Sequence, residues 1–306
     1  MKTRILLCSV IAAAMLVPAV AQQRAASSSG PPQAIPSSAP PQATGVAPLR
    51  VYLRGGLKTH GAGQHDYPQF VADWSNILTE RGAIVDGGLH FPTAPELEGV
   101  DVIIMYKGDS GYMTLGEKAT LESFLKRGGG LVGIHDTICT DDAAWFSTVF
   151  GGAKKHGETN FTLDANVPYT VVDKESPIMQ GIPDFALKDE AFFSMTWAKQ
   201  PDIHVLATAK IDATPSAVKA GHAGESVPQM WTYQRTMFGG QEFRAFVWMQ
   251  GHTYANLTHE HVQPMLLRAI AWVGKRPIDS LMTVRRAGRG GPPPGGAPKP
   301  PGRGGM

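Results

Sequence analysis

Cysteine is nearly absent from this 306-residue chain, which contains only Cys8 and Cys139. Cys8 lies in an apolar N-terminal stretch that we expect to be removed, so one cysteine remains. An intramolecular disulfide is then excluded, and stability must come from a hydrophobic core, which roughly 230 residues can build. The chain also lacks the G-x-S-x-G motif that displays a catalytic serine in α/β hydrolases.

A large excess of one charge sign is missing as well. The chain has 28 Lys and Arg against 26 Asp and Glu, a formal net charge of +2, and part of the basic excess falls in residues 285–306. A domain without a basic excess lacks the electrostatic footprint of nucleic-acid binding. We therefore expect no nucleic-acid partner, and the sequence leaves open whether the chain forms a homo-oligomer.

The first 21 residues have the three parts of a signal peptide. Lys2 and Arg4 form the positive start, residues 5–17 are apolar, and residues 19–21 (AVA) form a small-x-small cleavage site. An N-terminal membrane anchor is the alternative, but the uncharged run is short and Pro18 with its small neighbours favours cleavage. We expect a periplasmic or secreted protein with no membrane span after signal cleavage.

Three further regions follow the signal peptide. Residues 22–48 are mostly Ala, Ser, Pro and Gln, and residues 278–306 form a basic, Pro- and Gly-rich tail. Neither stretch has enough large apolar side chains to join a core, so both are expected to be disordered. One folded domain is therefore predicted over residues 49–277.

The domain alternates strand and helix signals. Apolar or β-prone runs predict strands at residues 49–53, 83–85, 100–106, 131–134, 169–172, 205–209, 229–233 and 245–249. Helical periodicity predicts helices at residues 68–81, 114–127, 141–150 and 259–273. This alternation indicates an α/β fold with a mostly parallel central sheet and helices on both faces.

Histidines collect where the predicted strands end. His60 and His65 follow the first strand, His135 follows the fourth and His252 follows the last, with Asp66 and Asp136 beside them. A single histidine is as often structural as functional. Ligands of open α/β sheets bind at the carboxyl ends of the strands, so four histidines there favour a functional site.

Several motifs occur in a characteristic order. They are residues 61–67 (GAGQHDY), 128–135 (GGGLVGIH), Trp145 followed by 150–152 (FGG) and His156, 189–190 (DE), and 250–252 (QGH) before 269–272 (AIAW). Over residues 49–277 the chain resembles the trehalose-utilisation (ThuA-like) family. The resemblance implies a class I glutamine amidotransferase-like fold, which is a flavodoxin-like three-layer sandwich.

The resemblance also implies carbohydrate catabolism, by cleavage or hydration of a disaccharide or glycoside that can be a 3-keto sugar. The amidotransferase cysteine is missing, and His135 lies near its position, which excludes thioester chemistry. The side chains expected to bind such a sugar are His60, His65, Asp66, Tyr112 and Trp145.

Two mechanisms fit these residues. In the first, His135 or His252 is a general base and Glu190 or Asp136 is its acid or orienting partner. In the second, a divalent metal such as zinc is held by ligands drawn from His65, His135, His156 and His252. Close-spaced histidine pairs are missing among them, which favours the metal-free mechanism.

A non-catalytic binding function is the alternative to both mechanisms. A fold of this kind without its cysteine nucleophile could bind a sugar or a partner without turning it over, because fold alone does not define function.

The signal-peptide assignment predicts that the mature chain begins at Gln22. Protein purified from a host that exports it is expected to have the intact mass of residues 22–306, as measured by mass spectrometry. A purified protein that retains Met1 would contradict the assignment.

Overall fold

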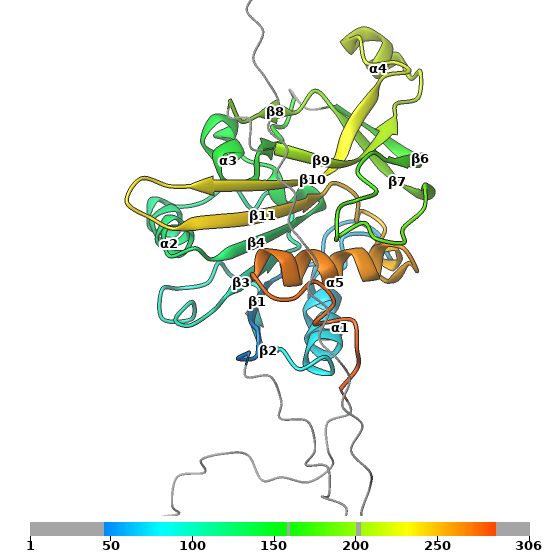
Figure 1. Cartoon of the computed structure of the whole chain (residues 1–306). Coiled ribbons are helices and arrows are strands. Elements are labelled where there is room, and N and C mark those ends of the chain that lie inside the picture. Colours follow the sequence, from blue (N-terminus) through cyan, green and yellow to red (C-terminus); the bar gives the residue numbers. More distant parts are fainter. Residues whose placement is uncertain (1–45, 158–159, 200–202, 286–306) are drawn as a thin grey trace, which may run out of the picture. The chain divides into compact units, whose positions relative to one another are not determined.

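The computed structural model describes residues 46–157, 160–199 and 203–285 (Figure 1). The expected signal peptide, most of the expected spacer and residues 286–306 of the expected tail lie outside the described residues. Within the described part, helices separate most of the strands up to residue 150, and a run of strands with one short helix follows from residue 152 to residue 248.

One half of the central sheet is parallel. Its strands lie in the order β2 (Ile84–Gly88), β1 (Arg50–Arg54), β3 (Val102–Met105), β4 (Gly130–Ile134) and β11 (Glu242–Trp248), and each pairs in parallel with the next. β3 and β4 are buried along their whole length, as expected for central parallel strands that are covered on both faces. Each of these strands overlaps a run that the sequence predicts.

The other half of the sheet is antiparallel. It continues as β10 (Ser226–Thr236), β9 (Ile203–Lys210), β6 (Asn160–Val171) and β7 (Phe185–Phe193). The sheet is therefore mixed, whereas the sequence predicted a mostly parallel one. A β-prone run says nothing about strand direction, and the short connection between β10 and β11 makes a hairpin, which requires antiparallel pairing.

Four helices cover the parallel strands. α1 (Tyr67–Thr79) and α5 (Val262–Val273) share one core cluster, and α2 (Leu115–Lys126) and α3 (Ala143–Phe150) share the other. Alternate residues of one strand enter different clusters, since successive strand side chains point to opposite faces. The expected three-layer sandwich thus describes at most this parallel half.

Five short elements complete the described chain. They are β5 (Gly152–Ala153), which pairs with β8 (Thr196–Trp197), the helix α4 (Pro215–Ala220), and the 3-10 turns η1 (His135–Ile138) and η2 (Tyr254–Thr258). The helix α4 projects from the strands β9 and β10 (Figure 1).

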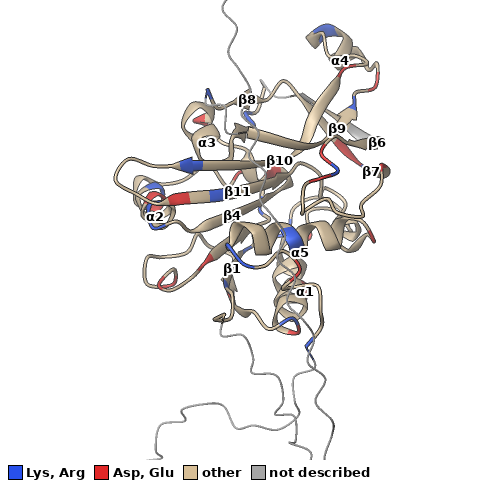
Figure 2. Cartoon of the chain, viewed as in Figure 1, with Lys and Arg blue, Asp and Glu red and all other residues tan. Residues whose placement is uncertain are grey.

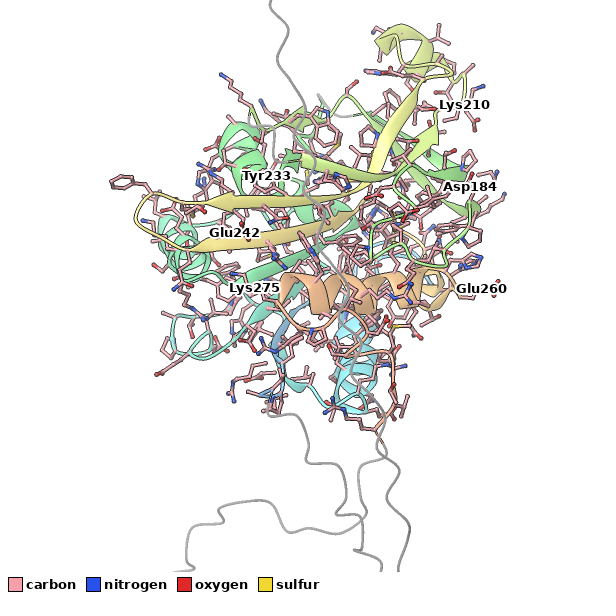
Figure 3. The ribbon with its side chains drawn as sticks, in the orientation of Figure 1. Asp184, Lys210, Tyr233, Glu242, Glu260 and Lys275 are labelled. Atoms are coloured by element: carbon pink, nitrogen blue, oxygen red, sulfur yellow. The ribbon has the colours of Figure 1, made fainter. Side chains whose placement is uncertain are left out.

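Polar contacts define two of the helix ends. Just after α5, Lys275 lies beside Glu242 of β11, and its Nζ donates a hydrogen bond of 2.5 Å to the Glu242 carbonyl (Figure 3). At the start of α2, Thr114 accepts from the backbone N–H of Glu117, whose carboxylate accepts from the N–H of Thr114. Charges of both signs are interspersed along the elements (Figure 2).

Core packing continues past the predicted domain end at Pro277. Leu281 is only 3% exposed, and Ile278 and Met282 pack against the same core cluster as α5. The described domain thus includes the first residues of the expected tail. No helix in the described ranges is long and apolar enough to cross a membrane.

The close approach of β4 to α5 predicts a stability difference between two glycine substitutions. A Cβ at Gly130 would lie 2.4 Å from the carbonyl oxygen of Val273, whereas one at Gly116 in α2 has nothing closer than 4.0 Å. Gly130→Ala is expected to lower the free energy of unfolding by ~1–3 kcal/mol, and Gly116→Ala to leave it unchanged or raise it by ~0.5–1 kcal/mol. Thermal denaturation measures both, and equal effects would contradict the packing described.

Candidate active site

The histidines predicted at the strand ends lie together. His65 Nε2 is 3.0 Å from His135 Nε2. The ring centroid of His65 is 4.6 Å from that of His252 and 3.9 Å from that of His60. They come from the β1–α1 loop, the end of β4 and the end of β11, so the carboxyl edge of the parallel half forms the site.

Three of these histidines have left-handed backbone conformations. The φ angles are 64° at His60, 45° at His65 and 58° at His135. Such angles cost a residue with a side chain about 1–3 kcal/mol and cluster at functional sites. The site therefore holds its imidazoles in place against a local backbone preference.

Hydrogen bonds set the orientation of two rings. His135 Nδ1 lies 3.1 Å from the carbonyl oxygen of Met249. Because a carbonyl can only accept, a neutral His135 carries its proton on Nδ1 and a lone pair on Nε2. His65 Nδ1 contacts Thr59 Oγ1 at 3.0 Å, and burial, followed by the neighbouring His135, lowers the pKa of His65 to about 3. His65 is therefore neutral at pH 7.

Glu190 faces the histidines from β7. Its Oε2 is 3.7 Å from His135 Nε2 and its Oε1 is 3.5 Å from His252 Nδ1. Burial raises the pKa of Glu190 to about 7, although His135 and Lys154 oppose the change. Burial also lowers the pKa of His252.

Asp136 has a different electrostatic environment. Burial alone would raise its pKa, but His135 and Lys154 hold that pKa below its usual range. Lys154 is 3% exposed, and its Nζ lies 2.6 Å from Asp136 Oδ1. Two carboxyl groups at one site therefore have pKa values shifted in opposite directions.

The buried carboxylate of Asp189 fixes the loop that carries His252. It accepts from the backbone N–H groups of Gly251, His252 and Thr253 at 3.2 to 3.3 Å, and from Asn256 Nδ2 at 2.8 Å. Because Glu190 is the next residue, one short segment of β7 both supplies a carboxyl group and positions an imidazole.

Two buried glutamines join β7 to the neighbouring strands. Gln229 of β10 bonds both the N–H and the carbonyl of Phe192, at 3.1 and 2.7 Å. Gln250 Nε2 donates to the Glu190 carbonyl at 2.8 Å and to Gln229 Oε1 at 2.7 Å. These bonds hold the edge strand β7 against the ends of β10 and β11.

A cavity of about 580 Å³ opens beside the cluster, within the range of small-molecule sites. The predicted residues His60, His65, Asp136, His156 and Glu190 line it. Its other lining residues are Gly56, Leu57, Thr59, Tyr67, Leu89, Lys107, Gly108, Asp109, Lys154 and Phe161.

Two predicted residues lie behind the wall of the cavity. His135 is fully buried and His252 is 7% exposed. Neither is among the lining residues, whereas His65 and Glu190, which contact them, are. A ligand in the cavity reaches His65 and Glu190 first.

Other predicted sugar-binding residues lie away from the lining. Asp66 pairs with Lys58 at 2.8 Å just before α1. The indole of Trp145 stacks on Phe146, and Tyr112 is 49% exposed; neither lines the cavity.

His156 lies apart from the other metal-ligand candidates. Its Nε2 is 2.8 Å from Asp109 Oδ1, and it groups with Asp109 and Cys139 rather than with the buried histidines. Cys139 is fully buried, and burial raises the pKa of its thiol. The thiol therefore stays protonated at neutral pH.

Sequence reasoning missed Lys154 and Phe161, which both line the cavity. Lys154 Nζ lies 5.3 Å from the centroid of the Phe161 ring and 4.7 Å from that of Phe192. The only sequence signal is a lysine pair after the Phe150-Gly151-Gly152 turn, which is also typical of an exposed loop.

Comparison with known proteins identifies the family. The model of the ThuA family, described as trehalose utilisation, matches residues 58–273. The chain therefore belongs to the ThuA family, as its motifs predicted, and this family is one of carbohydrate metabolism. No curated protein is significantly similar to this sequence.

A solved structure of a ThuA-like protein shares the fold. A ThuA-like protein from Bacteroides uniformis ATCC 8492 superposes with a TM-score of 0.56 at 19% identity, over 77% of this chain and 95% of that one. Alpha-L-fucosidase isoenzyme 2 from Paenibacillus thiaminolyticus has a TM-score of 0.48 at 14% identity, over 74% of this chain and 33% of that one. The mmIFT52 N-terminal domain has a TM-score of 0.47 at 11% identity, over 74% and 96%. At 19% identity the likeness to the ThuA-like protein concerns the fold alone.

The buried Asp136–Lys154 pair predicts that removing one charged partner lowers the stability more than removing both. Lys154→Met leaves Asp136 without its partner and is expected to lower the free energy of unfolding by ~3–5 kcal/mol. Asp136→Asn added to Lys154→Met should restore most of that loss, because no buried charge remains. Denaturant unfolding of the single and double variants measures both.

A surface pair serves as the control. Lys174 lies 3.9 Å from Asp184, and both side chains are more than half exposed. Lys174→Met is expected to cost at most ~1 kcal/mol. A loss from Lys154→Met no larger than this would show that the buried pair is unimportant.

Proposed function

We propose that this chain is an exported enzyme of carbohydrate catabolism, a lyase or hydrolase that acts on a disaccharide or glycoside, including its 3-keto form. The observation that carries the proposal is the meeting of Glu190, His65 and Asp136 on the wall of one cavity. Membership of the trehalose-utilisation family supports a sugar as the substrate.

The cavity has the chemical character that a sugar requires. Hydroxyl groups need donors and acceptors, and Thr59, Lys107, Asp109 and Lys154 offer both around the wall. Phe161, which is 40% exposed, offers an apolar face for a sugar ring. A volume of about 580 Å³ suits a ligand of disaccharide size.

Glu190 and Asp136 are the residues we propose to move protons, because both carboxyl groups line the cavity. In a 3-keto glycoside the carbonyl at C3 acidifies the proton at C2. One group removes that proton, the electron pair forms a C1–C2 double bond, and the C1–O bond breaks. The other group gives a proton to the departing oxygen, so atoms and charge balance.

His135 and His252 are positioning residues in this proposal. The contact of His135 with His65, and those of both rings with Glu190, fix the orientation of the groups that reach the cavity. Export, which the N-terminal sequence suggests, would place this chemistry in the periplasm or outside the cell.

The proposal predicts a specific loss in Glu190→Gln. The amide keeps the size of the carboxyl group but cannot transfer a proton near neutral pH. Turnover of the substrate found in a screen of glycosides and 3-keto glycosides should fall by ~10²–10⁴-fold, while KM changes little. Product formation followed by chromatography measures both constants.

Glu175→Gln is the control, because Glu175 is exposed and lies outside the cavity lining; it should keep wild-type turnover. If the wild type binds sugars but turns none of them over, the chain is a sugar-binding module and the enzymatic proposal fails.

A further inference from the structure

We propose that His65, His135 and His252 together bind one divalent transition-metal ion, with zinc as the test ion. The three residues come from different loops, all are buried, and each offers a nitrogen within 4.8 Å of the others. The inference concerns the site of the proposed function and rests on that function only for the role of the metal. Metal binding itself is measured without turnover.

The spacing of the nitrogens fits a small cation. Zinc–nitrogen bonds of about 2.0–2.1 Å in a tetrahedral site place two ligand nitrogens roughly 3.3 Å apart. His65 Nε2 and His135 Nε2 are 3.0 Å apart. Small side-chain rotations would bring these two nitrogens to that separation.

The hydrogen bonds of two rings are those of metal ligands. His135 gives its Nδ1 proton to the Met249 carbonyl, which leaves the Nε2 lone pair directed at His65. Donation of the second ring N–H to a carbonyl or another oxygen is the usual way a ligand histidine is held. His65 Nδ1 contacts Thr59 Oγ1 at 3.0 Å, and a His65 that donates this hydrogen bond keeps its Nε2 lone pair for a metal.

His252 supplies the independent observation. Its side chain is 9% exposed, and its Nδ1, which lies 3.5 Å from Glu190 Oε1, makes no hydrogen bond among the described residues. A buried polar atom left without a partner costs about 1–3 kcal/mol. A cation held between the three rings gives this nitrogen a partner, and the nearby carboxyl groups of Glu190 and Asp136 balance the added charge.

The same cluster leaves room for catalysis. Three histidine ligands leave a coordination position for water or a substrate oxygen, as in catalytic zinc sites, and the cavity begins at His65 and Glu190. A second group, Asp109, Cys139 and His156, is also compact. His156 there is 57% exposed and already paired with Asp109, so the buried histidines are the stronger site.

The test is zinc binding by the full-length protein after its metal is removed with a chelator. Isothermal titration calorimetry should find one zinc ion per chain, and zinc at about 100 times its Kd should raise the Tm by roughly 5–10 °C. His65→Ala and His252→Ala should each weaken binding by at least ~10²-fold, and Thr59→Ala by ~10-fold. His156→Ala and the surface variant His204→Ala should keep wild-type affinity.

The titration of the wild-type protein tests the proposed zinc site even if a variant folds poorly. Absence of zinc binding by the wild type, or its loss in His156→Ala but not in His65→Ala, would overturn the proposal. Turnover that persists in metal-free protein would overturn the catalytic role of the metal and leave the proposed function standing. Zinc binding without any turnover would leave the metal site standing and refute the enzyme.

Discussion

The carboxylate of Asp189 is the contact on which the site depends. It is 2% exposed, and it lies on an antiparallel strand while its hydrogen-bond donors follow a parallel one. The two halves of the sheet pair directly between β10 and β11, and Asp189 adds a second connection at the site. Asp189 accepts from the backbone N–H of Glu190 and from the loop of His252, so one buried side chain positions both an acidic group and an imidazole of the site.

The parallel half of the sheet provides a rigid edge, and β7 of the antiparallel half lies against that edge. β3 and β4 are covered by helices on both faces, so the residues that follow them have little freedom. The left-handed conformations at His60, His65 and His135 are maintained by this frame. Glutamine amides then hold β7 against the edge, where the side chains of Lys154 and Asp136 complete the polar wall.

The amino-acid sequence was sufficient for the parallel half and its histidines, because apolar runs followed by polar residues predict strand ends directly. It was insufficient for β7, since the charged run Lys188–Glu190 interrupts the alternation expected of a strand. It could not place Lys154, whose burial depends on an ion pair between residues 18 positions apart. It also joined His156 to the other histidines, whereas the fold pairs that residue with Asp109.

The most direct test of the histidine cluster as one centre is the zinc K-edge X-ray absorption spectrum of the zinc-loaded protein. Ligation by His65, His135 and His252 predicts nitrogen or oxygen neighbours at about 2.0–2.1 Å, with outer-shell scattering from imidazole rings and no sulfur. A sulfur neighbour at about 2.3 Å would place the ion at Cys139 instead and contradict the account.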